Sequence, residues 1–249
     1  MAHKIKVGAV SYLNTKPLIY GFEHGKMRDE IELIIDYPAN IADLLINHRI
    51  DIGLVPVAII PSLKEYHIIS DYCIGCDGEV ASVCLFSNVP LQQIETILLD
   101  YQSRTSVALL KILLKDRWNI SPVLIAGKAD YENEIDGTTA GLVIGDRALQ
   151  QRQKSKYIFD LGTGWKEMTG LPFVFAAWVS NKKPPDAFIN SFNAANAIGF
   201  TQLQQVIEQN PLSGFDLEQY YTRYVKFKLN SRMQEAKALF LKKISTITA

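Results

Sequence analysis

The sequence predicts an α/β protein made of two lobes, and three observations lead to this fold class. Apolar segments of strand length alternate with helix-patterned segments over the first 56 residues, which is typical of a parallel sheet. The same alternation resumes near residue 97 as a second, smaller set. Everything after residue 185 has the pattern of helices, so the chain is expected to end in a helical segment.

The first lobe begins with a strand, a turn and a helix. Residues 5–10 form an apolar run rich in β-branched side chains, which predicts a strand. Asn14 or Thr15 is placed to cap the following helix, with Pro17 in its first turn and Gly25 beyond its end.

The other elements follow from the same two periodicities. Further strands are expected at residues 31–35, 51–56, 68–76, 80–87, 97–100, 123–125, 140–144, 157–161 and 173–180. Helices are expected at residues 39–48, 103–118, 186–210, 216–229 and 231–247, with a short helical or turn segment at 164–170. Asp77-Gly78 is a turn signal between two strands, and the Lys-Lys-Pro-Pro sequence at 182–185 separates the helical tail from the last strand.

The order of these elements sets the expected lobe boundaries. The chain leaves lobe one near Ser87 and returns near Ala177, so lobe one is residues 1–87 plus 177–249 and lobe two is 88–176. The tail is expected to pack on lobe one. Two crossings make a hinge, and a ligand is expected in the crevice at the carboxyl ends of the strands. This arrangement is that of the type II periplasmic binding proteins.

Composition excludes several classes of function. Lysine plus arginine and aspartate plus glutamate both number 26, so the charge balance does not favour nucleic-acid binding. The N-terminus lacks a secretory signal and no apolar run reaches the ~20 residues of a membrane span, so a cytoplasmic protein without a membrane partner is expected. The absence of G-x-G-x-x-G, P-loop, H-E-x-x-H and G-x-S-x-G motifs argues against nucleotide, zinc and nucleophilic-serine chemistry.

The three cysteines do not form a convincing metal site. Cys73-x-x-Cys76 has no second pair and no nearby histidine, whereas zinc usually takes four ligands. These two residues and Cys84 are expected to be reduced, interior thiols.

Polar segments follow several of the predicted strands. Ser11, Tyr12 and Asn14 follow the first strand, where a hydroxyl, an amide and a helix N-terminus can together hold a carboxylate. Simple capping by Asn14 is the alternative. Pro56 and Val57, after the third strand, are candidates for the floor of the same cleft.

A second polar segment opens the helix expected at 103–118. The hydroxyls of Ser103, Thr105 and Ser106 converge with free backbone N–H groups, which makes a potential anion site. Arg104 is placed to add a bidentate contact to a carboxylate, although an arginine in a first turn more often points to solvent. The hydroxyls are therefore preferred over Arg104 as ligand contacts.

Three further segments have both a functional and a structural interpretation. Ser82 lies at the expected hinge, where its hydroxyl either reaches the cleft or faces solvent. Gly145 and Asp146 end a buried strand, so Asp146 is a candidate general base, ligand contact or N-cap. Thr169 and Phe173 flank a Gly-Leu-Pro turn, with core packing as the alternative for Phe173.

Taken together, these segments resemble one enzyme family, the chorismate dehydratases, which open the futalosine route to menaquinone. The resemblance covers the chain to about Trp178, and it rests on the following motifs in this order: Ser11-Tyr12-Leu13-Asn14-Thr15-x-Pro17, Asp51-x-Gly53-Leu54-x-Pro56, Val80-x-Ser82-Val83-x-Leu85-Phe86-Ser87, Ser103-Arg104-Thr105-Ser106, Ile144-Gly145-Asp146 and Thr169-Gly170-Leu171-Pro172-Phe173-Val174-Phe175.

The resemblance implies a hydro-lyase that converts chorismate to 3-[(1-carboxyvinyl)oxy]benzoate and water, with no metal or organic cofactor. Asn14 and Ser82 are the expected catalytic residues, because they would hold the enolpyruvyl carboxylate while it takes the C3 proton. Ser103, Thr105 and Ser106 would anchor the ring carboxylate, and Asp146 is the rival base.

Two other functions stay open at this point. The fold is shared with non-catalytic receptors for small carboxylated ligands, and fold does not determine function. The second alternative is the naphthoate-forming cyclase of the same pathway, although its N-terminal signature differs from Ser-Tyr-Leu-Asn. The oligomeric state, the leaving-group acid and the hinge residues are not assigned from the sequence.

Overall fold

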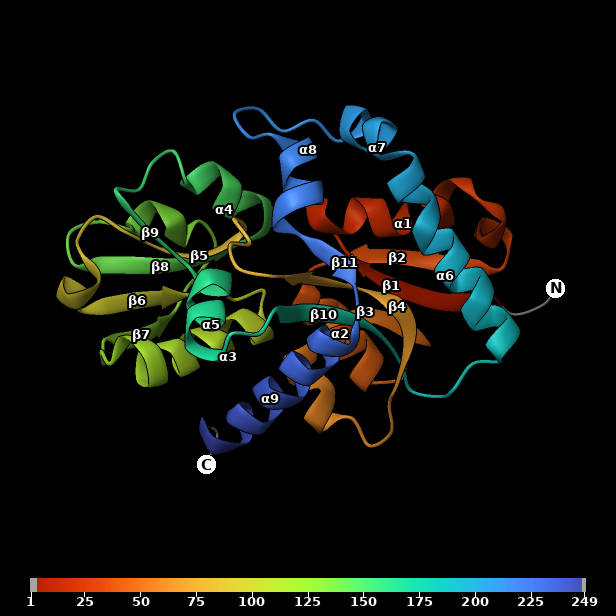
Figure 1. The fold of residues 1–249 in the computed structure, drawn as a ribbon, viewed down its shortest axis with the longest axis horizontal. Coiled ribbons are helices and arrows are strands. Elements are labelled where there is room, and N and C mark those ends of the chain that lie inside the picture. Colours follow the sequence, from red (N-terminus) through yellow and green to blue (C-terminus); the bar gives the residue numbers. More distant parts are fainter. Residues whose placement is uncertain (1–3, 248–249) are drawn as a thin grey trace.

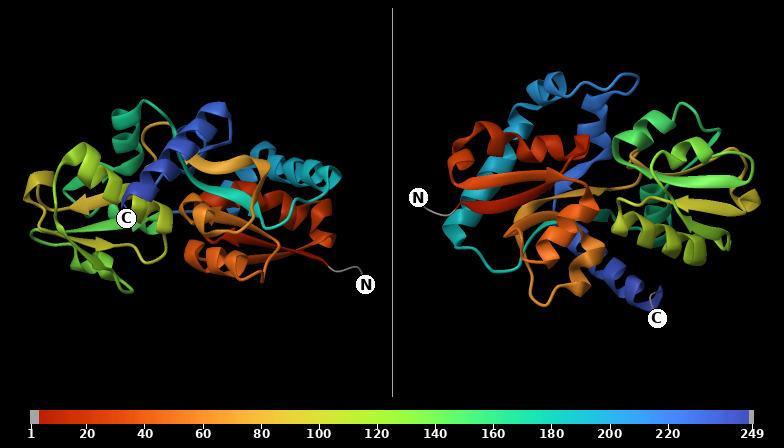
Figure 2. Two further views of the ribbon diagram at one scale, coloured as in Figure 1. Left: turned by 90° about the horizontal axis from the view of Figure 1, so that it is seen from below. Right: turned by 180° about the vertical axis from the view of Figure 1, so that it is seen from behind.

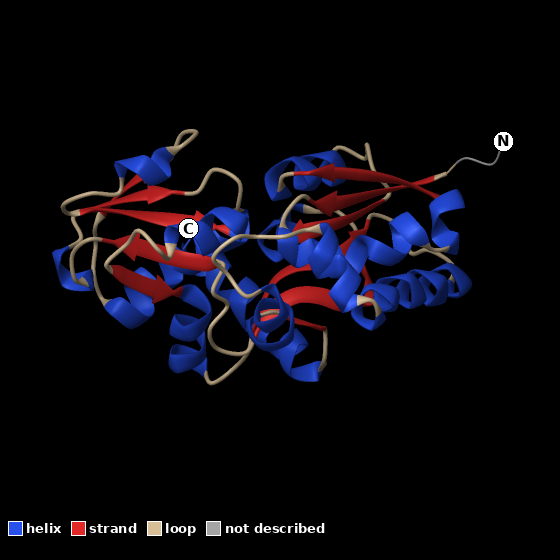
Figure 3. Ribbon diagram, turned by 90° about the horizontal axis from the view of Figure 1, so that it is seen from above, coloured by secondary structure: helices blue, strands red, loops and turns tan. Residues whose placement is uncertain are grey.

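The two predicted lobes are present, each built on its own β-sheet with helices around it (Figure 1). The structure is a computed structural model that describes residues 4–247. Residues 1–3 and 248–249 of the expected first lobe therefore lie outside the described residues. Viewed from above, the sheets lie side by side as separate units (Figure 3).

The first sheet has six strands in the order β11-β4-β10-β3-β1-β2. Its strands are β1 (Ile5–Val10), β2 (Ile31–Asp36), β3 (Ile52–Pro56), β4 (His67–Cys76), β10 (Phe173–Ser180) and β11 (Lys226–Lys228). β1 runs parallel to β2 and to β3, as the βα rhythm predicts, and β10 is antiparallel to both β3 and β4. The carboxyl ends of β1 and β3 consequently meet at one edge of the sheet.

The second sheet has five strands in the order β7-β6-β8-β5-β9. Its strands are β5 (Val83–Ser87), β6 (Thr96–Leu99), β7 (Val123–Ala126), β8 (Thr139–Ile144) and β9 (Tyr157–Asp160). β6 is parallel to β7 and β8, whereas β5 is antiparallel to β8 and β9.

Strand pairing puts the two crossings between the sheets earlier than the sequence suggested. Ser87 ends a strand of the second sheet, and Ala177 lies in the middle of a strand of the first. The chain therefore crosses at residues 77–82 and again between β9 and β10. The boundary was misplaced because a continuous apolar run at 80–87 hides a bend at Ala81, whose φ is +64°.

The helices pack around the two sheets. They are α1 (Lys16–His24), α2 (Pro38–Ile46), α3 (Arg104–Leu113), α4 (Gly145–Gln151), α5 (Leu161–Thr169), α6 (Asp186–Thr201), α7 (Leu203–Gln209), α8 (Leu217–Gln219) and α9 (Ser231–Ile247). α6 packs on α1 of the first lobe, whereas α9 contacts both β10 and α3 and lies across the junction of the lobes (Figure 2). The tail thus bridges the lobes as well as covering lobe one.

The predicted helix at 216–229 is only partly correct. α8 leads into a π-helical turn at Tyr220–Tyr224, and the chain then forms the edge strand β11 on β4. Tyr220 and Tyr221 of this turn are buried by packing inward, because the turn lies against the mouth of the cleft between the lobes. Among residues 4–247, no helix is both long and apolar enough to cross a membrane.

Candidate active site

A cleft of about 480 Å³ of atom-free space, part of it open to solvent, lies between the lobes where the parallel strands end. β1, β3 and β8 end at its wall, and the N-terminus of α3 points into it. Its lining combines apolar side chains with a few hydroxyl and amide groups: Val10, Tyr12, Asn14, Pro38, Pro56, Ile74, Val80, Ser82, Val83, Ser103, Ser106, Ile144, Gly145, Phe175 and Ala176. Apolar walls with a few polar groups are typical of small-molecule sites.

A larger hollow of about 1020 Å³ lies on the outer side of lobe one, over β4 and β11. It does not touch the carboxyl ends of the parallel strands, where ligands bind in open α/β sheets. Its lysine Lys228 lies over the ring of Tyr72, 3.6 Å from the centroid. We therefore take the cleft between the lobes as the candidate site.

The loop after β1 is held by lobe two and by the tail. The Leu13 N–H donates to Asp146 Oδ1 at 3.0 Å, and the Tyr221 hydroxyl donates to the Leu13 carbonyl at 3.0 Å. Thr15 occupies the N-cap position of α1 as predicted, but neither Asn14 nor Thr15 accepts a side-chain hydrogen bond from that helix. The Asn14 side chain is therefore directed to the cleft rather than to the helix.

Tyr12 reaches from lobe one to lobe two. Its hydroxyl donates to Gln102 Oε1, and its ring lies flat against Gly145, where an added Cβ would stand 2.9 Å from ring atoms. Burial, followed by the nearby Asp100 carboxylate, raises the pKa of Tyr12, so this hydroxyl stays a neutral donor.

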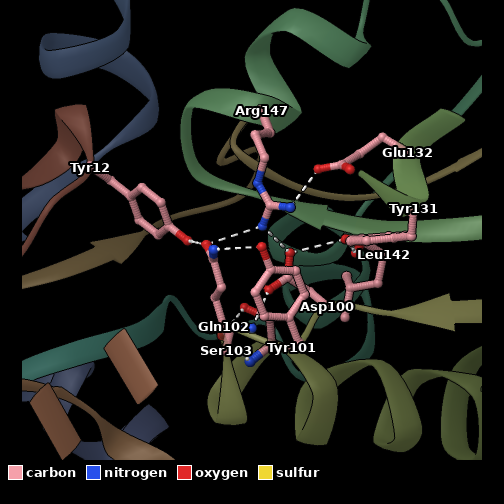
Figure 4. Close-up of polar contacts among 10 residues, drawn as sticks. Tyr12, Asp100, Tyr101, Gln102, Ser103, Tyr131, Glu132, Leu142 and Arg147 are labelled. Atoms are coloured by element: carbon pink, nitrogen blue, oxygen red, sulfur yellow. Dashed lines mark hydrogen bonds and ion pairs between the residues drawn. The ribbon is translucent and has the colours of Figure 1, made fainter. Parts of the chain in front are cut away.

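Gln102 is one member of a polar network in lobe two (Figure 4). Arg147 donates to Asp100 Oδ2 at 2.7 Å and to Gln102 Oε1 at 3.1 Å, and it also pairs with Glu132. Tyr131 donates to the same Asp100 oxygen at 3.0 Å. Because two carboxylates already neutralise Arg147, its guanidinium orients Gln102 rather than binding an anionic ligand.

In the first turn of α3, two side chains line the cleft and two others contact lobe one. Ser103 caps the helix by accepting the Ser106 N–H at 3.1 Å, and both hydroxyls line the cleft. Thr105 instead accepts the Ala58 N–H at 3.1 Å, and Arg104 pairs with Asp43 at 2.7 Å, so both bridge to lobe one outside the cleft. The division follows helix geometry, since residues three apart share a face while intervening ones point elsewhere.

Ser82 lies on the first crossing and lines the cleft, although its exposure to solvent is 0%. The Tyr220 hydroxyl, from the π-helical turn of the tail, donates to Ser82 Oγ at 2.7 Å. The crossing itself is braced by Asp160, whose carboxylate accepts the N–H groups of Val80 and Ala81.

Asp146 lies beside the cleft but does not line it. Its carboxylate is engaged by the Leu13 N–H, and burial raises its pKa, with that hydrogen bond opposing the shift. Asp146 does not accept a hydrogen bond from an N–H of its own helix, so it is an inter-lobe contact rather than an N-cap.

Four other predicted site residues lie outside the cleft lining. Ser11 donates its backbone N–H to Asp36, and Val57 is buried beneath the cleft floor. Thr169 donates to the Trp165 carbonyl at 2.8 Å, and Phe173 packs edge-on against Trp165 with centroids 5.1 Å apart.

Sequence reasoning missed Phe175 and Tyr220. Phe175 lies two residues from Phe173 on the same strand, so period-2 alternation made it an equal candidate. No pattern marked Tyr220, because its place at the cleft depends on a contact across 138 residues of chain.

Residues 4–247 contain no cluster of three or more histidine, cysteine, aspartate or glutamate side chains that could hold a metal ion. The three cysteines are free and buried, and burial raises the pKa of each thiol.

Comparisons with known proteins give matches over most of the chain. A protein family described as menaquinone biosynthesis matches residues 5–246. The chorismate dehydratase of Thermus thermophilus is 28% identical over 224 residues, which span 81% of this chain and 80% of that protein. The chorismate dehydratase of Campylobacter jejuni is 27% identical over 244 residues, spanning 94% and 95%.

Two solved structures illustrate the fold. A protein of Archaeoglobus fulgidus superposes with a TM-score of 0.75 at 16% identity, covering 99% of this chain and 98% of that one. The periplasmic aliphatic sulphonate binding protein of Escherichia coli superposes with a TM-score of 0.62 at 14% identity, covering 100% and 92%. The fold is therefore that of the periplasmic binding proteins, as the order of elements predicted.

Proposed function

The chain belongs to the menaquinone-biosynthesis family, and from this membership and the geometry of the cleft we propose that it is a chorismate dehydratase. The reaction removes water from chorismate and leaves 3-[(1-carboxyvinyl)oxy]benzoate, so the enzyme is a hydro-lyase. The two dehydratases that it resembles align over most of their length with it.

The polar groups of the cleft suit a ligand with two carboxylates. Ser103 and Ser106 stand at the N-terminus of α3, where free N–H groups and the helix dipole favour an anion. Asn14 and Ser82 stand at the other side of the same cleft. The placement of these hydroxyl and amide groups in the lining of one cleft is the observation that carries the proposal.

The apolar part of the cleft suits the ring between those carboxylates. Pro56, Ile144 and Phe175 supply flat or branched apolar surface. Arg147 is neutralised by Asp100 and Glu132, so hydroxyls, amides and the helix N-terminus hold the substrate.

The elimination needs a base for the C3 proton and departure of the C4 hydroxyl. The C3–H electrons form the new ring double bond, the C4–O bond breaks, and aromatisation drives the step. We assign the base to the enolpyruvyl carboxylate of the substrate, which Asn14 and Ser82 aim at C3. Asp146 is a poor alternative, because its carboxylate is engaged by Leu13 and does not line the cleft.

The two sheets serve as hinged lobes in this proposal. The first comprises residues up to Cys76 and from Phe173 onward, and the second comprises the strands from Val83 to Asp160. Closure over chorismate excludes water, which strengthens each hydrogen bond in the cleft and protects the enol ether.

The decisive experiment incubates purified protein with chorismate and follows substrate and product by absorbance and mass, beside a reaction without protein. We expect loss of chorismate matched by a product lighter by one water. Binding without turnover would instead favour a receptor for small carboxylates. Neither binding nor turnover would favour the cyclase alternative.

The assignment of the base is tested by Asp146→Asn. We expect substantial turnover to remain, because the amide oxygen still accepts the Leu13 N–H. Complete loss of turnover with unaltered chorismate binding would make Asp146 the base.

A further inference from the structure

The tail of the chain contributes a buried tyrosine to the candidate site. Tyr220 is fully buried and lies in the π-helical turn at Tyr220–Tyr224. Its ring is fixed by Phe215 and Tyr221, with centroids 6.0 Å and 5.5 Å away. Its hydroxyl therefore has little freedom to choose another partner.

That hydroxyl contacts Ser82, one of the two residues proposed to hold the enolpyruvyl carboxylate. It donates to Ser82 Oγ at 2.7 Å. We propose that Tyr220 is a positioning residue, which orients the Ser82 hydroxyl so that it donates to the substrate. This inference rests on the proposed chorismate dehydratase function.

The single proton of the Tyr220 phenol determines how the Ser82 hydroxyl is oriented. A phenol has one proton, and Tyr220 gives it to Ser82. The Ser82 oxygen then accepts the hydrogen bond from Tyr220, which leaves the hydroxyl proton of Ser82 free to donate into the cleft. Burial raises the pKa of Tyr220, so the phenol stays protonated and keeps this arrangement.

Ser82 depends on Tyr220 for this orientation. Among the described residues, its hydroxyl has no other side-chain or backbone hydrogen bond than the one from Tyr220. Without that bond the hydroxyl can rotate and donate away from the cleft. A substrate carboxylate that is held by fewer donors spends less time aimed at its own C3 proton, and small misplacements of reacting groups are costly in rate.

Tyr220→Phe removes the hydroxyl and keeps the ring. We expect kcat to fall about 10- to 100-fold, with KM within about threefold of wild type because the ring carboxylate is anchored separately at Ser103 and Ser106. The kcat value is expressed per folded protein, with folding followed by circular dichroism. The matched control is Tyr224→Phe in the same turn, a half-buried residue outside the cleft lining, which we expect to leave kcat within about twofold.

A double-mutant cycle tests whether Tyr220 acts through Ser82. In a Ser82→Ala background, Tyr220→Phe is expected to lower kcat by less than about threefold, because its target hydroxyl is already gone. The inference is overturned if Tyr220→Phe alone keeps wild-type kcat, or if the two losses multiply in full. A wild-type protein that does not convert chorismate would overturn the proposed function instead, so the two failures are distinguishable.

Discussion

Adding a single methyl group at Gly145 tests whether contact between Tyr12 and lobe two supports catalysis. Gly145 has φ +63°, and a Cβ there would stand 2.9–3.0 Å from three ring atoms of Tyr12. The ring cannot move aside easily, because its hydroxyl binds Gln102 and the next residue is held by Asp146.

Gly145→Ala has two separable costs. The left-handed backbone costs about 1 kcal/mol for alanine in any arrangement of the lobes. The clash with Tyr12 adds about 1–3 kcal/mol, and it applies only while the lobes are together. We therefore expect the unfolding free energy to fall by about 1 kcal/mol, and kcat/KM for chorismate to fall about 5- to 150-fold.

Gly137→Ala is the matched control. Gly137 also has a left-handed φ, +53°, but a Cβ there meets nothing within 4 Å. Chemical denaturation and steady-state kinetics of both variants separate backbone strain from the clash, and small-angle scattering reports whether Gly145→Ala holds the lobes apart. Equal kcat/KM for the two variants would refute the role of the Tyr12 contact.

Three further predictions follow from individual contacts. Ser103→Ala removes the cap of α3 and one proposed anchor of the ring carboxylate. We therefore expect denaturation to show an unfolding free energy lower by about 1 kcal/mol, and steady-state kinetics to show KM raised on the order of tenfold. Burial raises the pKa of Asp146, so above that pKa the charged carboxylate lowers the free energy of unfolding. This destabilisation disappears as the pH falls toward about 3.9, the pKa of an aspartate in the unfolded chain. Urea titrations at neutral and acid pH should therefore show wild type gaining stability relative to Asp146→Asn on acidification, and a constant difference would contradict the raised pKa. Asp43→Asn breaks an ion pair in which the side chains of Arg104 and Asp43 are 41% and 53% exposed. We therefore expect the unfolding free energy to change by less than about 1 kcal/mol, and turnover to change little.

The order of strands and helices could be predicted well because each element carries its own periodicity. Residues 5–10 and 140–144 are apolar runs of strand length, and both are strands in the structure. Ser103 was a strong candidate for a site on α3 because a hydroxyl before an amphipathic stretch is a local signal. Predictions of this kind need no knowledge of what the segment packs against.

The roles of neighbouring polar residues could not be predicted in the same way. Ser103 and Thr105 looked equivalent in the sequence, yet one faces the cleft and the other binds Ala58 of lobe one. The difference depends on the rotation of α3 against a segment 47 residues away. The edge strand β11 was also not predicted, because it forms only through backbone pairing with β4.

The contact between Tyr221 and Leu13 spans 208 residues, and together with that of Tyr220 it makes the cleft a product of nearly the whole chain. Contacts between such distant segments form late in folding, because the loop between them must first be ordered. Each lobe can therefore acquire its sheet before the site exists. We expect activity to appear only in the slowest phase of refolding, after most of the secondary structure has been regained.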